Sequence, residues 1–138
     1  MALELVRVSW QSFPCGWMLR WLNEEGRYAA ELVSSAPPRR DLCSGMLNSD
    51  DAAAAWRLVR AILESETNNP LTPPSTPHIG FVVPVTPQGE EAELSPYYFY
   101  AEKDKRLSTR NYVQLVVLLN AYMNSHYLSL VQRDELWK

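Results

Sequence analysis

Alternating hydrophobic and polar residues predict a strand near the start of the chain. In residues 3–10, LELVRVSW, the apolar positions recur with the period of two that a half-buried strand requires. We therefore expect one face of this strand to lie against a core, namely the face that carries Val6, Val8 and Trp10.

A hairpin is predicted over residues 17–33. Two strand-like runs flank Asn23–Gly26, and Gly26 is free to take the positive φ that closes a loop of this length. In the expected register, the core face holds facing pairs, which are Trp21 with Tyr28, Leu19 with Ala30, and Trp17 with Leu32. The other face is mixed and expected to be solvated, with Met18, Arg20, Arg27, Ala29 and Glu31.

Helical spacing of apolar residues follows in two later segments. In residues 50–65, with Ser49 as the expected N-cap, one side is apolar and carries Ala52, Ala55, Trp56, Val59, Ile62 and Leu63. The last helix is expected to be capped by Ser108 and to run through residues 109–131. Its core stripe consists of Tyr112, Leu115, Val116, Leu119, Tyr122, Met123, His126, Tyr127 and Leu130.

Two proline-containing segments interrupt these elements. Residues 34–45, SSAPPRRDLCSG, break the alternation and are interpreted as a connection. Residues 66–77 contain four prolines and predict a stiff extended connector. A second hairpin around residues 86–89 then sets Phe81 opposite Leu94 and Val83 opposite Ala92 on the core face. Tyr98 and Tyr100 are expected to continue this core face, whereas Val82 points away from it.

These elements predict one α+β domain over residues 1–138. Its sheet would be mostly antiparallel and five-stranded, in the order β-β-β-α-β-β-α along the chain, with the two helices packed on one face. At 15.8 kDa and 46% hydrophobic residues, the chain is large enough to bury one core.

Composition argues against binding to nucleic acids or to membranes. The net charge of -3 and a pI near 5.4 give no overall attraction to nucleic acid or anionic lipid, and no apolar run is long enough to span a membrane. The stretch from Tyr97 to Arg106 combines aromatic and basic residues, notably Phe99, Lys103 and Lys105. Because Glu91 and Glu93 are expected on the same face, RNA binding there is the least favoured hypothesis, and we expect a cytoplasmic protein without nucleic-acid or membrane partners.

The sequence predicts no catalytic, cofactor or metal site. The five glycines are too far apart for a phosphate-binding loop, and neither His78 nor His126 has a second His or Cys at metal-ligand spacing. Cys15 and Cys43 stand far apart and are expected to be buried thiols. An alternative hypothesis is a small enzyme or ligand-binding protein with a pocket between helix and sheet, lined by His126, Tyr122, Tyr100 and Cys43.

The last helix has apolar residues on both sides, which favours a contact on its far side. It is either central in the fold or covered by another molecule, and its polar residues there are uncharged. The predicted interface consists of Val117, Leu118, Ala121, Leu128 and Trp137. We therefore expect a non-enzymatic protein–protein interaction module, such as an adaptor, chaperone or immunity-type binder, that acts as a homodimer.

Overall fold

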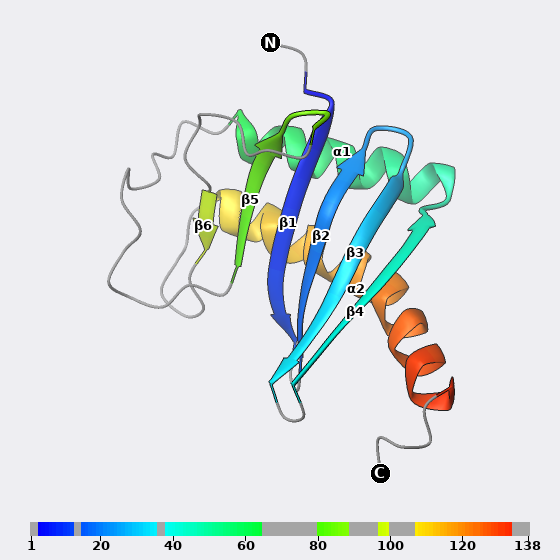
Figure 1. Cartoon of the computed structure of the whole chain (residues 1–138). Helices are drawn as coiled ribbons and strands as arrows, with labels where there is room; N and C mark the ends of the chain where they lie inside the picture. The colour runs from blue at the N-terminus through cyan, green and yellow to red at the C-terminus, as the bar shows by residue number, and fades with distance from the viewer. Residues whose placement is uncertain are drawn as a thin grey trace.

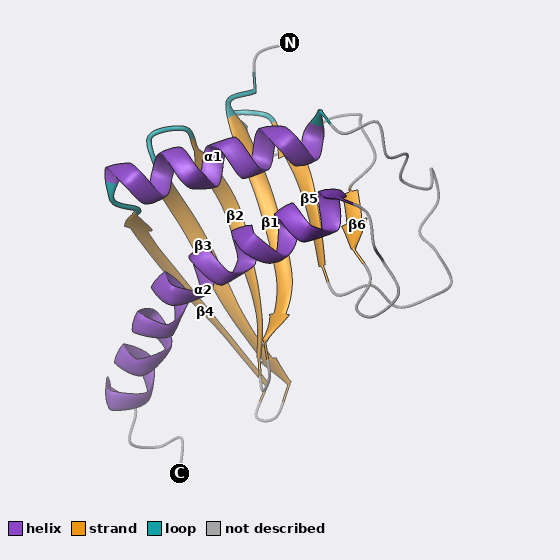
Figure 2. Cartoon of the chain, turned by 180° about the vertical axis from the view of Figure 1, so that it is seen from behind, coloured by secondary structure: helices purple, strands orange, loops and turns teal. Residues whose placement is uncertain are grey.

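The computed structural model describes residues 3–12, 15–35, 38–64, 80–88, 97–99 and 107–133. The described strands form one antiparallel sheet in the spatial order β4-β3-β2-β1-β5-β6 (Figure 1). The strands are β1 (Leu5–Ser12), β2 (Cys15–Asn23), β3 (Arg27–Ser35), β4 (Pro38–Met46), β5 (Gly80–Val85) and β6 (Tyr97–Phe99). Helices α1 (Ser49–Leu63) and α2 (Leu107–Arg133) lie on the same face of the sheet (Figure 2).

The predicted α+β class, with an antiparallel sheet and two helices on one face, is confirmed, but the sheet has one strand more than expected. The segment interpreted as a connection forms β4, which pairs with β3 along its whole length. Proline is tolerated here because Pro38 is the first residue of an edge strand. The alternation is inverted, since the solvent side carries apolar residues and the core side carries Asp41, Cys43 and Gly45.

The turn between β2 and β3 is the predicted one. Gly26 has φ of 95°, and its N–H donates to the carbonyl oxygen of Asn23 at 3.0 Å. The side-chain oxygen of Asn23 also accepts from the backbone N–H of Arg27 at 2.9 Å. A side chain at position 26 would be strained twice, because a Cβ there would lie 2.8 Å from the Cβ of Ala52 in α1.

The register of this hairpin is partly as predicted. A β-bulge between Leu19 and Trp21 shifts the pairing by one residue toward the turn, so Tyr28 faces Leu22 instead of Trp21. Leu22 is therefore the buried residue, and Trp21 is half-buried on the other face. The two predicted pairs farther from the turn are confirmed, namely Trp17 with Leu32 and Leu19 with Ala30.

The predicted facing of β5 is wrong, although Val83 is fully buried as expected. Val82 is fully buried in the core and lies opposite Val8 of β1, whereas Phe81 is half-buried and pairs with Tyr98 rather than with Leu94. Every residue from Phe81 to Val85 is apolar, so the period of two leaves no trace in this strand. The pairing of Val83 with Ala92 falls outside the described residues.

Helix α1 buries the predicted side. Its N-cap is Asn48, one residue before the expected Ser49, and the Asn48 side chain accepts from the backbone N–H of Asp51 at 2.8 Å. The helix ends at Leu63, which is half-buried, and its buried residues are Ala52, Ala55, Trp56, Leu58, Val59 and Ile62.

Helix α2 begins at Leu107, one residue before the predicted cap, and crosses the sheet from β6 to beyond β4 (Figures 1 and 2). The hydroxyl of Tyr112 donates to the carbonyl oxygen of Ser9 at 2.8 Å, and Nε1 of Trp10 donates to Oδ1 of Asn120 at 3.3 Å. The buried residues of α2 follow the predicted stripe and are Tyr112, Leu115, Leu119 and Met123.

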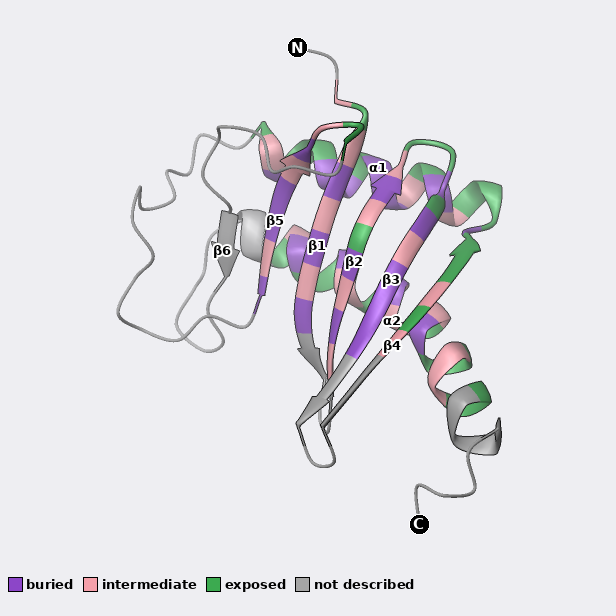
Figure 3. Ribbon diagram, viewed as in Figure 1, coloured by how far each residue is buried: buried purple, intermediate pink, exposed green. Residues whose placement is uncertain are grey.

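Buried residues recur along the strands and along both helices (Figure 3), and the core cluster joins residues of β1, β2, β3, β5, α1 and α2. Neither described helix combines the length and the hydropathy of a membrane-spanning helix. The predicted connector at 66–77, together with Tyr100 and Trp137, lies outside the described residues.

Candidate functional site

The exposed side of α2 is largely apolar. The exposed fraction is 67% for Val117 and 58% for Leu128, and Val113 beside them is 48% exposed. Five exposed residues follow one another at alternating intervals of three and four positions, the spacing of a helix–helix contact. This outer stripe consists of Gln114, Val117, Ala121, Asn124 and Leu128.

The residues predicted as an interface divide between the two sides of α2. Val117, Ala121 and Leu128 lie on the outer stripe, while Leu118 is half-buried and packs against the core. Trp137 lies outside the described residues. Helix α1 contacts α2 but leaves the outer stripe exposed. The alternative in which the fold itself buries both sides of α2 is therefore excluded for Val117, Ala121 and Leu128.

The outer stripe carries no charge. Between Arg110 and Arg133, α2 contains no Asp, Glu, Lys or Arg. Exposed helix sides that face water normally carry such residues, and the cores of protein interfaces are depleted in them. This combination of exposure and neutrality is typical of a contact surface.

A polar cluster lies on the opposite side of α2, between this helix, β3 and the start of α1. The hydroxyl of Tyr28 and Nε2 of His126 are 2.7 Å apart, and the two rings meet edge to face with centroids 5.9 Å apart. One helical turn earlier, the hydroxyl of Tyr122 donates to Oδ2 of Asp51 at 2.6 Å and accepts from the backbone N–H of Asn48 at 3.0 Å. These bonds fasten the second half of α2 to both neighbouring elements.

The pKa values in this cluster favour the neutral forms. Burial raises the pKa of Tyr28 to about 12, with further contributions from Cys43 and Tyr122. Burial, together with the nearby charge of Asp41, raises the pKa of the Cys43 thiol to about 11. Burial also lowers the pKa of His126. At neutral pH the thiol is therefore protonated and the imidazole is uncharged, which is a poor setting for a thiolate nucleophile.

Three of the predicted pocket residues, namely His126, Tyr122 and Cys43, lie in or next to this cluster. Cys43 lies on the same face of β4 as Gly45 and acts on the pKa of Tyr28, which is bonded to His126. A Cβ at position 45 would lie 2.5 Å from the Tyr28 hydroxyl, so the phenol rests directly on the β4 backbone. Tyr100 lies outside the described residues.

Two hollows in the described surface lie elsewhere. One of about 360 Å³ is lined by Leu3 and Glu24 near the β2–β3 turn, and one of about 700 Å³ runs along α1 beside Trp56 and Arg57. Neither is lined by His126, Tyr122 or Cys43. Among the residues that the structure describes, no group of three or more His, Cys, Asp or Glu side chains is placed to hold a metal ion.

The chain matches no protein-family model, no curated protein and no solved structure. Its function must therefore be inferred from the geometry of its own residues.

Sequence reasoning missed the partners of His126. Tyr28 and His126 stand 98 positions apart, and Tyr122 is 71 positions from Asp51. The helical periodicity placed His126 and Tyr122 on the inner side of α2, but only the packing of α2 across β3 and the start of α1 selects their partners. The turn at Gly26 was a usable signal, because it predicted Tyr28 on the core face and its partner on β2 to within one residue.

Proposed function

We propose that the protein is a small protein–protein interaction module, such as an adaptor, chaperone or immunity-type binder, that acts as a homodimer through the outer stripe of α2. The supporting observation is the exposure of Val117 and Leu128, at 67% and 58%, on a helix side without charge. Side chains of this kind gain free energy when another surface removes them from water.

A second copy of the chain is the partner that this stripe fits. Each chain has a net charge of -3, so a contact between copies is favoured where neither contributes charge. Ala121 lies at the middle of the stripe, and a small residue there permits two antiparallel helices to approach closely. A two-fold axis that sets Ala121 against its copy places Gln114 of one chain near Leu128 of the other, and Val117 near Asn124.

The test is the oligomeric state of an interface variant and a matched control. Val117→Asp combined with Leu128→Asp adds two negative charges to the outer stripe, and Ala53→Asp combined with Ala61→Asp adds the same charge to the exposed side of α1. Light scattering after size-exclusion chromatography at about 100 µM, well above the Kd of a dimer of about 1 µM, measures the mass of each.

We expect the wild type and the α1 variant to be dimers and the α2 variant to be a monomer. The α2 variant should unfold cooperatively, because both substituted side chains are exposed in the single chain. A monomeric wild type at this concentration, or an α2 variant that remains dimeric, contradicts the proposal.

The alternative function, an enzyme or ligand binder around His126, has less support. His126 has a polar partner in Tyr28, as an active site requires, but the neighbouring groups are packed against the β4 backbone and held in neutral forms. The free thiol of Cys43 agrees with a reducing compartment such as the cytoplasm, which we propose as the location.

A further inference from the structure

The face of the sheet that the helices leave uncovered carries basic side chains together with exposed apolar ones. This helix-free face is turned toward the viewer in Figures 1 and 3. Among the residues whose side chains the structure describes, the strand register and the ion pair of Arg20 place on it three arginines, one glutamate and two exposed apolar residues, which are Arg7, Arg20, Arg27, Glu31, Leu42 and Met46.

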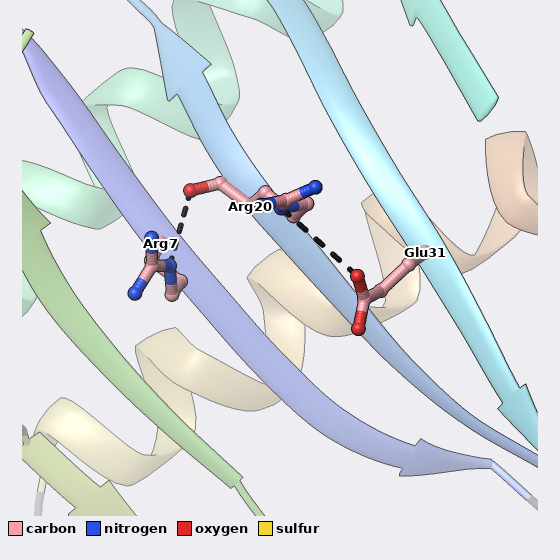
Figure 4. A network of polar contacts seen from close by, with 3 residues as sticks. All are labelled: Arg7, Arg20 and Glu31. Carbon is pink, nitrogen blue, oxygen red and sulfur yellow. Dashed lines mark hydrogen bonds and ion pairs between the residues drawn. The ribbon is translucent and has the colours of Figure 1, made fainter. Parts of the chain in front are cut away.

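The bulge in β2 organises the centre of this face. It releases the carbonyl oxygen of Arg20 from the regular ladder, and Nε of Arg7 donates to that oxygen at 3.2 Å (Figure 4). The Arg20 side chain turns to the other side, where its Nε lies 4.0 Å from Oε2 of Glu31. Glu31 is only 5% exposed, so its carboxylate is covered and compensated while half of the Arg20 side chain is open to water.

The charge of this face is opposite to that of the whole chain. The chain carries -3, yet the described residues of the helix-free face provide three arginines against one buried glutamate. Exposed carboxylates gather instead at the β2–β3 turn, with Glu24 and Glu25, and at the start of α1, with Asp50. The helix-free face is thus complementary to an acidic partner.

The edge strand β4 borders this face, and none of the described strands pairs with its outer edge. Leu42 and Met46 are 65% and 55% exposed, and residues 42–46 contain no charged residue and no proline. Edge strands are usually protected by charge, proline or short length. By this measure β4 is a long edge strand, because it has nine residues, of which only Pro38 is a proline.

We propose that β4 and the helix-free face bind an acidic segment of a partner protein in extended conformation. The segment adds to the free edge of β4 as a further antiparallel or parallel strand through main-chain hydrogen bonds. Its apolar side chains cover Leu42 and Met46, and its carboxylates approach Arg27, which lies directly opposite Met46 in the register, and the exposed part of Arg20.

A polypeptide fits this surface better than a nucleic acid. The most exposed apolar side chains of this face, Leu42 and Met46, are aliphatic and offer no ring on which a base could stack. Its aromatic side chains Trp21 and Phe81 are half-buried. No described strand pairs with the outer edge of β4, and this edge supplies a row of backbone donors and acceptors that a peptide strand matches residue by residue.

The site does not depend on the homodimer. The helix-free face lies on the opposite side of the sheet from α2 (Figure 2). A dimer formed through the outer stripe would therefore leave this face uncovered in both copies. Peptide binding should therefore be the same for the wild type and for the monomeric variant Val117→Asp/Leu128→Asp, which separates failure of this proposal from failure of the dimer.

The test measures fluorescence anisotropy of labelled peptides of about ten residues, the length of a typical long strand. One peptide repeats Glu-Glu-Val-Val and a second repeats Lys-Lys-Val-Val, so that an added strand carries both residue types on each of its faces. An oligouridylate probes nucleic-acid binding. We expect the acidic peptide to bind and its affinity to fall as salt is raised. Arg27→Glu should weaken it about tenfold, whereas Arg57→Glu, the same charge change on the exposed side of α1, should leave it unchanged.

Amide hydrogen exchange distinguishes strand addition from a contact made by side chains alone. With the acidic peptide bound, the backbone amides of residues 42–46 that point away from β3 should exchange more slowly. The proposal is overturned if the acidic peptide does not bind, if the lysine peptide or the oligouridylate binds as tightly, if Arg27→Glu has no effect, or if the β4 amides gain no protection.

Discussion

Helices α1 and α2 cover the same face of the sheet, yet their outer sides differ. Both bury one side, with Trp56 and Ile62 in α1 and Leu119 and Met123 in α2. The exposed side of α1 carries Arg57, Arg60 and Glu64, and Nη1 of Arg60 lies 3.7 Å from Oε1 of Glu64.

The exposed side of α2 carries the neutral outer stripe instead. Both helices therefore pack an apolar side against the sheet, but their exposed sides differ in charge. The charged side of α1 is suited to water, and the neutral side of α2 is suited to contact with another surface. Burial in the single chain explains only the inner sides, so variants of inner and outer residues should behave differently.

The largest expected effect comes from the inner side of α2. Leu119→Ala should lower the free energy of unfolding by about 2–5 kcal/mol, because Leu119 is fully buried and its truncation leaves a cavity. Val117→Ala, two residues earlier on the outer stripe, should change it by no more than about 0.5 kcal/mol when measured on the monomer. Urea unfolding at low protein concentration gives both values, and equal values for the two variants would break the distinction between the sides.

A smaller effect is expected from the hydrogen bonds of the inner side. Tyr122→Phe removes the bond to Asp51 and the bond from Asn48, and should lower the free energy of unfolding by about 1–2 kcal/mol. Asn124→Ala, on the exposed side of the same helical turn, is the matched control and should have little effect on the monomer. If both variants unfold like the wild type, these bonds do not hold α2 in place.

The smallest effect is a pH dependence that originates at the inner side. Because burial lowers the pKa of His126 from 6.5, the unfolded chain binds a proton in a range where the folded chain does not. Stability is then complete above pH 6.5 and falls as the pH drops below it. At high pH the sign reverses, since the pKa of Tyr28 rises from 10.0 to about 12, so the folded chain keeps a proton that the unfolded chain has lost.

Urea midpoints measured across pH test both limbs of this dependence. His126→Gln should flatten the acid limb, and Tyr28→Phe should reduce the fall between pH 10 and 12. The outer-stripe variant Gln114→Ala removes no titratable group and should retain the whole profile. An acid limb that survives in His126→Gln would assign it to another group.

Much of the fold was predictable because its central strands alternate cleanly. Val6 and Val8 in β1, and Leu19 and Ala30 in the hairpin, show the period of two that a sheet with one buried face requires. Strand β4 was missed because the apolar side chain of Leu42 points to solvent, which reverses the expected pattern. Such a reversal is informative in itself, since it marks the edge that we propose binds a partner.

The candidate sites were predictable to different degrees. The outer stripe follows from helical geometry alone, because an angle of 100° per residue separates Val117 and Leu128 from the inner side of the helix. The bulge at Arg20 and the bond between Tyr28 and His126 depend on register and on packing across the whole domain. No local pattern in the sequence encodes either of them.

Strand β1 lies in the interior of the sheet, and the two strands that pair with it lie at very different distances from it along the sequence. β2 follows it almost directly, whereas β5 begins at Gly80, after α1 and the segment that follows it. In a folding chain that has formed only the first four strands and α1, one edge of β1 is not yet paired, because Val6 and Val8 pair with Pro84 and Val82 of β5. The pairing of β1 with β5 therefore joins residues far apart in the sequence. We expect the folding rate to be limited by this pairing rather than by the formation of the hairpins.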